Sequence, residues 1–440
     1  MSRETKTIYN GVALPMTEMS IVKDLEGLLQ DNGYLDEGES IPVVSKDKIE
    51  SHESKIGFYA ENNFVVALAV RYCELTSLPE SLDQLTHLQQ LDLTGNQLSS
   101  LPESLRDLLH LKKLYLDENQ ITSLPESLGN LLRLEEIQLD KNQLASLPES
   151  IGQLTNLKIL NAYGNRLVSV PASLSQLIRL TEVSLGRNQL KSLPESFWQL
   201  TNLQLLNVGE NQLSSLPESI ENLTHLHTLD VGHNELTSLP ESLGNLRNLT
   251  FFLYLSNNHL TSLPESLEKL IHLRYLNITD NSLSSLPENI GNLTSLQELR
   301  VYTNELTALP ESLGNLIHLQ ELHVMNNKLV SLPTSLGNLT CLKELDVMNN
   351  SLTALPESLG SLTHLTHLDL RNNRLMALPE SLGNMMRLTH LDLRGNKLVS
   401  LPACIGDLAN LEKLDLRWNK LSSVPEWLQR LEQRGCTVFK

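Results

Sequence analysis

Hydrophobic positions recur along most of this chain with a fixed period, and leucine occupies the majority of them. Sixteen prolines stand in register from Pro79 to Pro425, and every step is 23 residues except that from Pro240 to Pro264, which is 24. Between these prolines the unit reads LPESLGNLTHLxxLDLxxNxLxS, as in residues 216–238. The alternating LxL stretch predicts a short strand with leucine inward, and the ESLGNL stretch predicts a short helical or 3₁₀ turn.

An asparagine follows each strand segment at the same position of the repeat. Its side-chain carbonyl and amide can hydrogen-bond the open backbone of neighbouring coils, so that buried loop groups are paired. We therefore predict a structural role for this asparagine ladder. It consists of Asn96, Asn119, Asn142, Asn165, Asn188, Asn211, Asn234, Asn258, Asn281, Asn304, Asn327, Asn350, Asn373, Asn396 and Asn419.

Both ends of the repeat array have sequence suited to closing it. Residues 57–70, GFYAENNFVVALAV, predict a β-hairpin whose second strand begins the array. In this first unit Cys73 replaces the ladder asparagine; we interpret it as a small buried residue, with a reactive thiol as the alternative. Residues 425–434 place Trp427, Leu428 and Leu431 on one face of a short helix, which predicts a C-terminal cap.

The N-terminal segment differs in composition from the repeats. Residues 17–30 have amphipathic helical spacing, which predicts a helix packed over the first repeats or, alternatively, a partner-binding or dimerising helix. Residues 35–55 are rich in charge and serine and read as a linker. The expected domains are therefore an N-terminal helix and linker (1–56), a repeat array with its hairpin cap (57–424) and a C-terminal cap (425–440).

With these features the chain resembles the leucine-rich-repeat family, whose consensus LxxLxLxxNxL followed by LPxxLxxL recurs in almost every unit from about residue 65 to 431. It is most similar to the 23-residue class of intracellular Ras-group and phosphatase-scaffold proteins. The resemblance implies an α/β fold: a curved, horseshoe-like solenoid of about sixteen repeats, with a concave parallel β-sheet and short helical or 3₁₀ convex segments. By analogy it also implies a role in signalling, with a small GTPase or a phosphatase as partner.

Composition narrows the range of functions. The chain has 52 acidic and 34 basic residues and a net charge of −18, which argues against nucleic acid as a partner. Glutamate follows the repeat proline in 13 of the sixteen units, so much of this charge belongs to the convex side. The sequence lacks a long apolar run and a secretory signal, and its four cysteines are scattered, so we expect a cytoplasmic protein with no membrane contact.

Candidate chemistry is sparse. No phosphate loop, metalloprotease motif or hydrolase motif occurs, so we expect no enzyme activity, no catalytic residues and no cofactor. Rows of aspartate, arginine and histidine recur at equivalent strand positions near the C-terminal end, beginning at Asp346. We interpret them as cross-strand charge pairs, with a partner-binding patch and a metal bridged by His367, His390 and the aspartates as alternatives. No metal site is assigned.

Outward strand positions in the middle of the array have aromatic and methionine side chains, although aromatic residues make up only 4% of the chain. Tyrosine, methionine and arginine are enriched in protein interfaces. The direction of Phe252 is left open because of the extra residue within 250–253. We therefore predict a non-enzymatic scaffold that binds a partner protein on its concave face; the alternative is a receptor for a small or charged ligand at the charged rows.

The predicted binding surface combines the central aromatic residues with the C-terminal basic residues. Its members are Tyr254, Tyr275, Arg300, Tyr302, His323, Met325, Met348, Arg371, Arg394, Arg417, Trp418 and Lys420.

Overall fold

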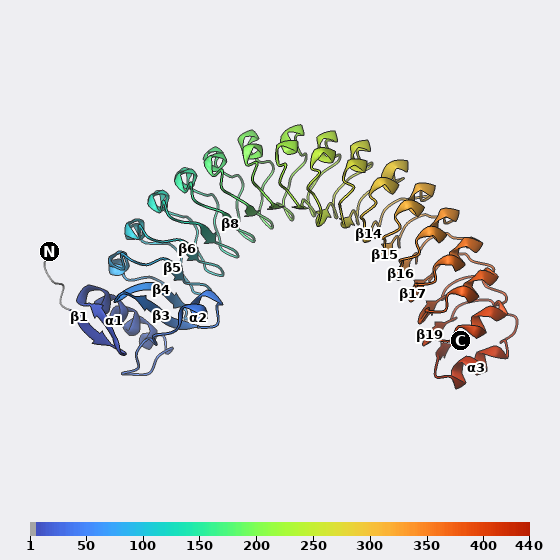
Figure 1. Cartoon of the computed structure of the whole chain (residues 1–440), viewed down its shortest axis with the longest axis horizontal. Helices are drawn as coiled ribbons and strands as arrows, with labels where there is room; N and C mark the ends of the chain where they lie inside the picture. The colour runs from blue at the N-terminus through green and yellow to red at the C-terminus, as the bar shows by residue number, and fades with distance from the viewer. Residues whose placement is uncertain (1–5) are drawn as a thin grey trace. The chain divides into compact units, whose positions relative to one another are not determined.

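The computed structural model describes residues 6–440, most of which form a series of repeated coils (Figure 1). Each coil contains one short strand and one 3₁₀ turn, and within each of two compact units the strands lie on one side and the turns on the other (Figure 1). The first unit extends to Gln212 and the second runs from Leu213 to Lys440. The predicted repeat solenoid is therefore confirmed.

The first unit begins with four strands and two helices and continues with six regular coils. Its elements are β1 (Lys6–Tyr9), β2 (Val12–Pro15), α1 (Met16–Asp31), α2 (Lys46–Glu50), β3 (Ile56–Glu61), β4 (Phe64–Val70), β5 (Gln90–Asp92), β6 (Lys113–Tyr115), β7 (Glu136–Gln138), β8 (Ile159–Asn161), β9 (Glu182–Ser184) and β10 (Leu205–Asn207). Its 3₁₀ turns are Glu80–Gln84, Glu103–Asp107, Glu126–Asn130, Glu149–Gln153, Ala172–Gln176 and Glu195–Gln199.

The second unit consists of regular coils and a C-terminal cap. Its elements are β11 (Thr228–Asp230), β12 (Phe252–Tyr254), β13 (Tyr275–Asn277), β14 (Glu298–Arg300), β15 (Glu321–His323), β16 (Glu344–Asp346), β17 (His367–Asp369), β18 (His390–Asp392), β19 (Lys413–Asp415), α3 (Trp427–Gln433) and β20 (Thr437–Phe439). Its 3₁₀ turns are Glu218–Asn222, Glu241–Asn245, Glu265–Lys269, Glu288–Asn292, Glu311–Asn315, Thr334–Asn338, Glu357–Ser361, Glu380–Asn384 and Ala403–Asp407.

The core of each unit is built from equivalent leucines stacked coil on coil. In the parallel pair β14–β15, for example, Leu299 is opposite Leu322, and both are fully buried. The neighbours of Leu299 in the strand, Glu298 and Arg300, point outward and are only partly buried. A period of two thus puts leucine in the core and polar side chains on the outer surface of the sheet.

The ladder asparagines connect successive coils. Asn165 Nδ2 donates to the carbonyl oxygens of Leu139, in the preceding coil, at 2.9 Å and of Ala162 at 3.1 Å, while Asn165 Oδ1 accepts the Leu144 amide at 3.0 Å. The residue before each ladder asparagine from Asn96 onward has positive φ, as at Gly164 (69°), which turns the chain away from the strand. The asparagine side chain therefore hydrogen-bonds buried loop groups that lie outside the β-sheet hydrogen bonding.

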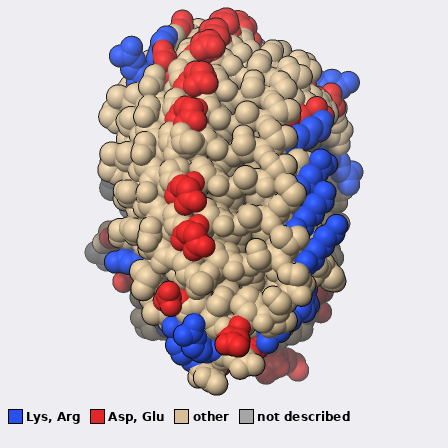
Figure 2. Space-filling view, turned by 90° about the vertical axis from the view of Figure 1, so that its right-hand side faces the viewer, with Lys and Arg blue, Asp and Glu red and all other residues tan. Residues whose placement is uncertain are grey.

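The glutamates after the repeat prolines also link coils. Glu126 Oε2 accepts the Ser150 amide of the next coil at 3.0 Å, and Glu218 accepts the Ser242 amide at 2.9 Å. Hydrogen bonds from these serines lower the pKa of both glutamates. Figure 2 shows a column of acidic side chains interrupted by uncharged positions, with a row of basic side chains to one side of it. Much of the chain's negative charge thus serves an architectural purpose.

The N-terminal segment contains more regular structure than the helix and linker predicted from the sequence. The predicted helix is α1, which packs beside the first 3₁₀ turn and buries Ile21, Val22 and Leu25; an antiparallel β1–β2 hairpin precedes it. The expected linker is wrong for residues 43–54, because Val43 bridges Phe58 and α2 buries Ile49 against the outward face of β4. This tertiary packing outweighs the polar composition of the segment.

A buried ion pair fastens this segment to the first strands. Arg71 Nε donates to Asp92 Oδ2 at 2.7 Å, and its remaining nitrogens donate to the carbonyl oxygens of Ser54 at 2.7 Å and Ile49 at 3.0 Å. Asp92 is fully buried and also contacts His52 Nδ1 at 3.0 Å. The outward face of β4 and β5 is therefore already occupied by the chain's own residues.

Both predicted end structures are present. The hairpin is formed by β3 and β4, which pair antiparallel, and β4 then pairs parallel with β5. The C-terminal helix is α3, which buries Trp427, Leu428 and Leu431. The sequence interpretation missed β20, which pairs parallel with β19 and completes the sheet edge.

The 24-residue step leaves the sheet undisturbed. β12 pairs in register with β11 and β13, with Leu253 opposite both Leu229 and Leu276. The additional residue is taken up before the strand, where Phe251 is 43% exposed. Phe252 therefore points outward, which resolves the direction left open by the sequence. Among residues 6–440, no helix combines the length and apolar character that a bilayer span requires.

Candidate partner-binding face

Three columns of side chains cover the outer surface of the sheet in the second unit. The first residue of each strand forms one column and the third residue forms the second; the third column lies two residues beyond the strand, at positions such as Tyr302. Equivalent residues of adjacent strands are about 4.8 Å apart, so each column is a row of neighbouring side chains. The predicted binding residues from Tyr254 to Arg417 all fall in these columns.

An aromatic cluster lies at the start of this surface. Ring centroids are separated by 5.7 Å between Phe252 and Tyr254, 5.4 Å between Phe252 and Tyr275, and 5.1 Å between the two tyrosines. The Arg300 guanidinium lies 5.7 Å from the Tyr275 ring centroid. Burial raises the pKa of Tyr275 to about 12, so the phenol stays neutral. The cluster is preorganised, and Phe252 remains 40% exposed.

A mixed group of residues continues the surface across the next coils. Tyr302, His323, Met325 and Met348 are all partly buried, and His323 Nε2 lies 3.3 Å from Glu321 Oε2. The ligand atoms of Glu298, Glu321 and His323 lie within 4.8 Å of one another, which is close enough to hold a cation. Arg300 Nε, however, contacts Glu298 Oε1 and competes for that carboxylate.

The charged rows near the C-terminal end form a continuous ion-pair network. Arg371, Arg394 and Arg417 each bind the aspartate two residues before them. Arginine also reaches the next strand: Arg371 Nε lies 3.6 Å from Asp392 Oδ2, and Arg394 Nε lies 3.3 Å from Asp415 Oδ2. The contacts between neighbouring strands are the cross-strand charge pairs expected from the sequence, and the aspartates largely neutralise these arginines.

The histidines expected as possible metal ligands stack on each other. The His367 and His390 ring centroids are 4.5 Å apart with an interplanar angle of 13°. Burial, followed by the neighbouring His367, lowers the pKa of His390. In the described part of the chain, the only group of three metal-ligating side chains in close range is the one at Glu298, so the geometry does not support a metal bridged by His367, His390 and the aspartates.

Trp418 lies at the C-terminal end of this surface, and Lys420 follows it just beyond the ladder asparagine Asn419. The Trp418 side chain is 72% exposed, and its backbone has a φ of 60°, a conformation that is unfavourable for a bulky residue. The Arg417 guanidinium lies 5.7 Å from the Trp418 ring centroid and 4.8 Å from that of Phe439, on β20. Phe439 was missed by sequence reasoning because it falls outside the repeat register.

The sheet surface of the first unit has a different, acidic character. Burial raises the pKa of Asp117 to about 7, and burial also raises the pKa of Asp140. Asp117 Oδ1 accepts the Asp140 amide at 2.7 Å, and Asp140 Oδ1 accepts the Tyr163 amide at 2.8 Å. Each of these two carboxyl groups thus accepts a backbone amide of the next coil, and together they form a poorly hydrated acidic row.

This row predicts a pH dependence of stability. Because the folded-state pKa of Asp117 is above its ordinary value of 3.8, the folded chain binds more protons between pH 3.8 and about 7, and stability falls as pH rises through that window. Asp117→Asn keeps a side-chain oxygen that can accept the Asp140 amide but cannot ionise. It should therefore raise the free energy of unfolding at pH 8 by about 2 kcal/mol. Urea unfolding at several pH values tests this, and Asp107→Asn, at an exposed site, should leave the pH slope unchanged.

Three of the four thiols lie in settings that raise their pKa and so disfavour the reactive thiolate. Burial raises the pKa of Cys73 to about 11, and the Cys73 thiol donates to the Arg71 carbonyl oxygen at 3.1 Å. Burial also raises the pKa of Cys404 and Cys436. Cys73 thus has the small, buried environment expected from its position in the first coil.

Comparison with known families identifies repeats along most of the chain. The model described as "Leucine-rich repeat region" matches residues 103–209 and 256–355, and "Leucine rich repeat" matches 65–121 and 377–421. A further model, "Leucine Rich Repeat", matches 225–246 and 364–385. No curated protein sequence matches the chain at a significant level.

Several solved structures are similar to most of this chain. A leucine-rich-repeat protein of Leptospira interrogans is 33% identical with a TM-score of 0.79, covering 91% of this chain and all of that one. The Arabidopsis receptor kinase HAESA, solved with the peptide hormone IDA and the co-receptor SERK1, is 26% identical (TM-score 0.66; 90% and 78% covered). A plant peptide hormone receptor solved with RGF2 is 30% identical (TM-score 0.66; 81% and 63% covered).

Proposed function

The chain belongs to the leucine-rich-repeat family, and on that premise we propose that it is a non-enzymatic scaffold that binds a partner protein on the sheet surface of its second unit. The observation that carries this proposal is the cluster of Phe252, Tyr254 and Tyr275 with Arg300 beside it. Exposed, prepacked aromatic groups next to arginine are typical of interface anchors.

The binding mechanism rests on preorganisation. The anchor side chains lie on strands that are fixed by the leucine core, and the aromatic rings already contact one another. Few of these side chains therefore lose rotamer freedom when the partner binds, which lowers the entropy cost of binding. Tyr302, His323, Met325 and Met348 extend the apolar and polar contact area, while the paired arginines offer hydrogen-bond donors at the rim. Trp418 and Lys420 supply a second anchor at the far end of the surface.

Two further observations support this proposal. HAESA was solved with the peptide hormone IDA, and the plant peptide hormone receptor was solved in complex with RGF2; both have the same fold as this chain. In this chain, α2 already covers the outward face of β4, so the start of the first unit's sheet surface is occupied by the chain itself. The four free cysteines, together with the resemblance to the intracellular 23-residue class, favour a reducing compartment such as the cytoplasm.

The test compares two double variants in an affinity capture from cells that express the protein, followed by a binding titration with the captured partner. Tyr254→Ala with Tyr275→Ala should weaken binding by roughly tenfold or more, because two hot-spot side chains are lost. Tyr72→Ala with Tyr163→Ala removes the same side chains from the first unit and should change affinity less than about twofold. Unchanged affinity of the first variant, with an intact circular dichroism spectrum, would sink the proposal. Small GTPases and phosphatases are the first candidates to examine among captured proteins.

A further inference from the structure

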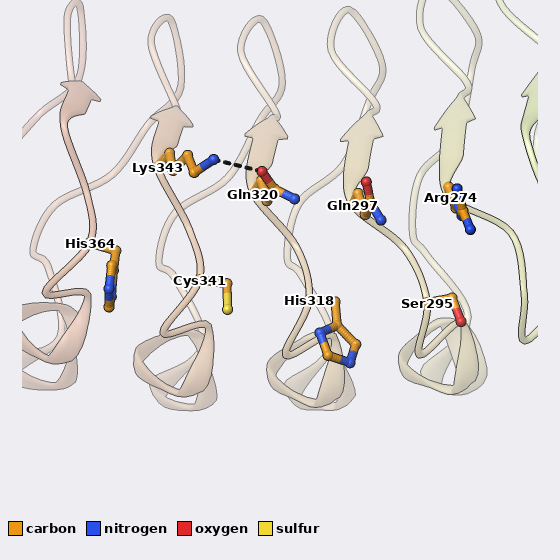
Figure 3. Close-up of a pocket in the computed structure, with 8 residues that line it drawn as sticks. All are labelled: Arg274, Ser295, Gln297, His318, Gln320, Cys341, Lys343 and His364. Carbon is orange, nitrogen blue, oxygen red and sulfur yellow. Dashed lines mark hydrogen bonds between the residues drawn. The ribbon is translucent and has the colours of Figure 1, made fainter.

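A groove runs along the second unit on a surface that the proposed partner-binding face does not use. Its volume is about 480 Å³, and two rows of side chains from successive coils line it (Figure 3). Arg274, Gln297, Gln320 and Lys343 form the row just before the strands, and Ser295, His318, Cys341 and His364 form the row nearer the 3₁₀ turns.

The groove is cationic in a chain that is otherwise acidic. Its lining contains a guanidinium, an ammonium and two imidazoles, and none of the described residues that line it has a carboxylate. Arg274, Lys343, His318 and His364 are all exposed. A row of acids begins at Glu298, one residue after Gln297, and the alternation of the strand directs this row to the sheet surface, away from the groove. These carboxylates on the sheet surface would repel an anionic ligand and so favour its binding within the groove.

The spacing of the two permanent charges defines the ligand. Arg274 and Lys343 occupy equivalent positions three coils apart, so three strand spacings of about 4.8 Å separate their backbones by roughly 14 Å. An extended peptide rises about 3.4 Å per residue, so acidic residues four apart span the same distance and point to the same side. The Lys343 ammonium donates to Gln320 Oε1 at 2.8 Å, which directs it along the groove (Figure 3).

We propose that this groove binds an extended peptide segment with anionic side chains at positions i and i+4, which lies across the coils. Arg274 and Lys343 receive the two anions, and the amides of Gln297 and Gln320 pair with the peptide backbone between them. The anion is a carboxylate or a phosphate, since both suit a guanidinium. This inference does not rest on the partner-binding face, because no residue of the aromatic cluster lines the groove.

Cys341 provides a reporter inside the groove. It is an exposed free thiol between His318 and His364, whereas Cys404 lies on a 3₁₀ turn of the same unit outside the groove lining. A bound peptide should slow alkylation of Cys341 relative to Cys404, which mass spectrometry resolves site by site. Four peptides are compared at low ionic strength: glutamates at i and i+4, phosphoserines at i and i+4, glutamates at i and i+1, and glutamine in place of glutamate.

The expected result is protection of Cys341 by one or both i, i+4 anionic peptides, and the stronger of the two identifies carboxylate or phosphate as the source. Arg274→Gln with Lys343→Gln should weaken binding roughly tenfold. Arg374→Gln with Lys397→Gln removes equal charge from exposed sites outside the groove lining and should have little effect. Equal protection by the i, i+1 or glutamine peptide, or undiminished binding by the Arg274/Lys343 variant, would overturn the proposal. The Tyr254/Tyr275 variant should bind these peptides normally, which separates this test from that of the partner-binding face.

Discussion

Replacing Asn327 by alanine should lower the free energy of unfolding by about 3 kcal/mol, because a buried side chain with several partners is lost. Asn327 Nδ2 donates to the carbonyl oxygens of Val301 at 3.1 Å and Val324 at 3.0 Å, and Asn327 Oδ1 accepts the Leu306 amide at 3.0 Å. Alanine leaves these backbone groups buried without a replacement partner. Urea denaturation of the variant measures the loss.

The control for this substitution is Asn338→Ala, at an exposed asparagine in the following 3₁₀ turn, which should change stability by less than about 0.5 kcal/mol. Because coils contact mainly their neighbours, amide exchange should accelerate most in the coils that flank Asn327. A loss of stability no greater than that of Asn338→Ala would contradict the role of the ladder.

Arg71→Met is expected to destabilise the N-terminal end by about 4 kcal/mol, since it leaves the Asp92 carboxylate buried without its main partner. The same substitution removes the two hydrogen bonds that hold Ser54 and Ile49. Residues 43–54 should therefore detach and uncover the outward face of β4, which limited proteolysis and thermal unfolding can detect.

A second variant separates the buried charge from simple loss of packing. Arg71→Met with Asp92→Leu removes both charges and should recover a large part of the lost stability, because apolar replacement of a complete buried pair is often tolerated. If the double variant were as unstable as Arg71→Met alone, the uncompensated carboxylate would not be the cause.

The repeat architecture was predictable because one physical pattern recurs in each coil. Leucine alternation predicts strands such as β14, and the proline with a short ESLGNL stretch predicts the turns. The C-terminal helix followed from the spacing of Trp427, Leu428 and Leu431. In contrast, α2 has only five residues, KDKIE, and its single apolar side chain, Ile49, gains a partner only when β4 is already folded. A local sequence pattern cannot reveal such a contact, because its partners are distant in the sequence.

The candidate sites were predictable to different extents. The columns that hold Tyr275 and Met325 follow from strand alternation, and so does the neighbourhood of Arg371 and Asp369. The neutralisation of Arg371 by aspartates of two strands was less evident, because rotamers decide it. The groove has a signal in the sequence, because His318, Cys341 and His364 are 23 residues apart and so occupy the same position in successive repeats.

The extra residue before β12 has a practical consequence for engineering. The chain absorbs it between Leu249 and Leu253, both fully buried, while pairing with β11 and β13 persists. That loop is thus a position where chain length can vary without a shift of register. A short epitope tag or a fluorophore-bearing peptide inserted there would be displayed beside the aromatic cluster, at a defined position on the scaffold.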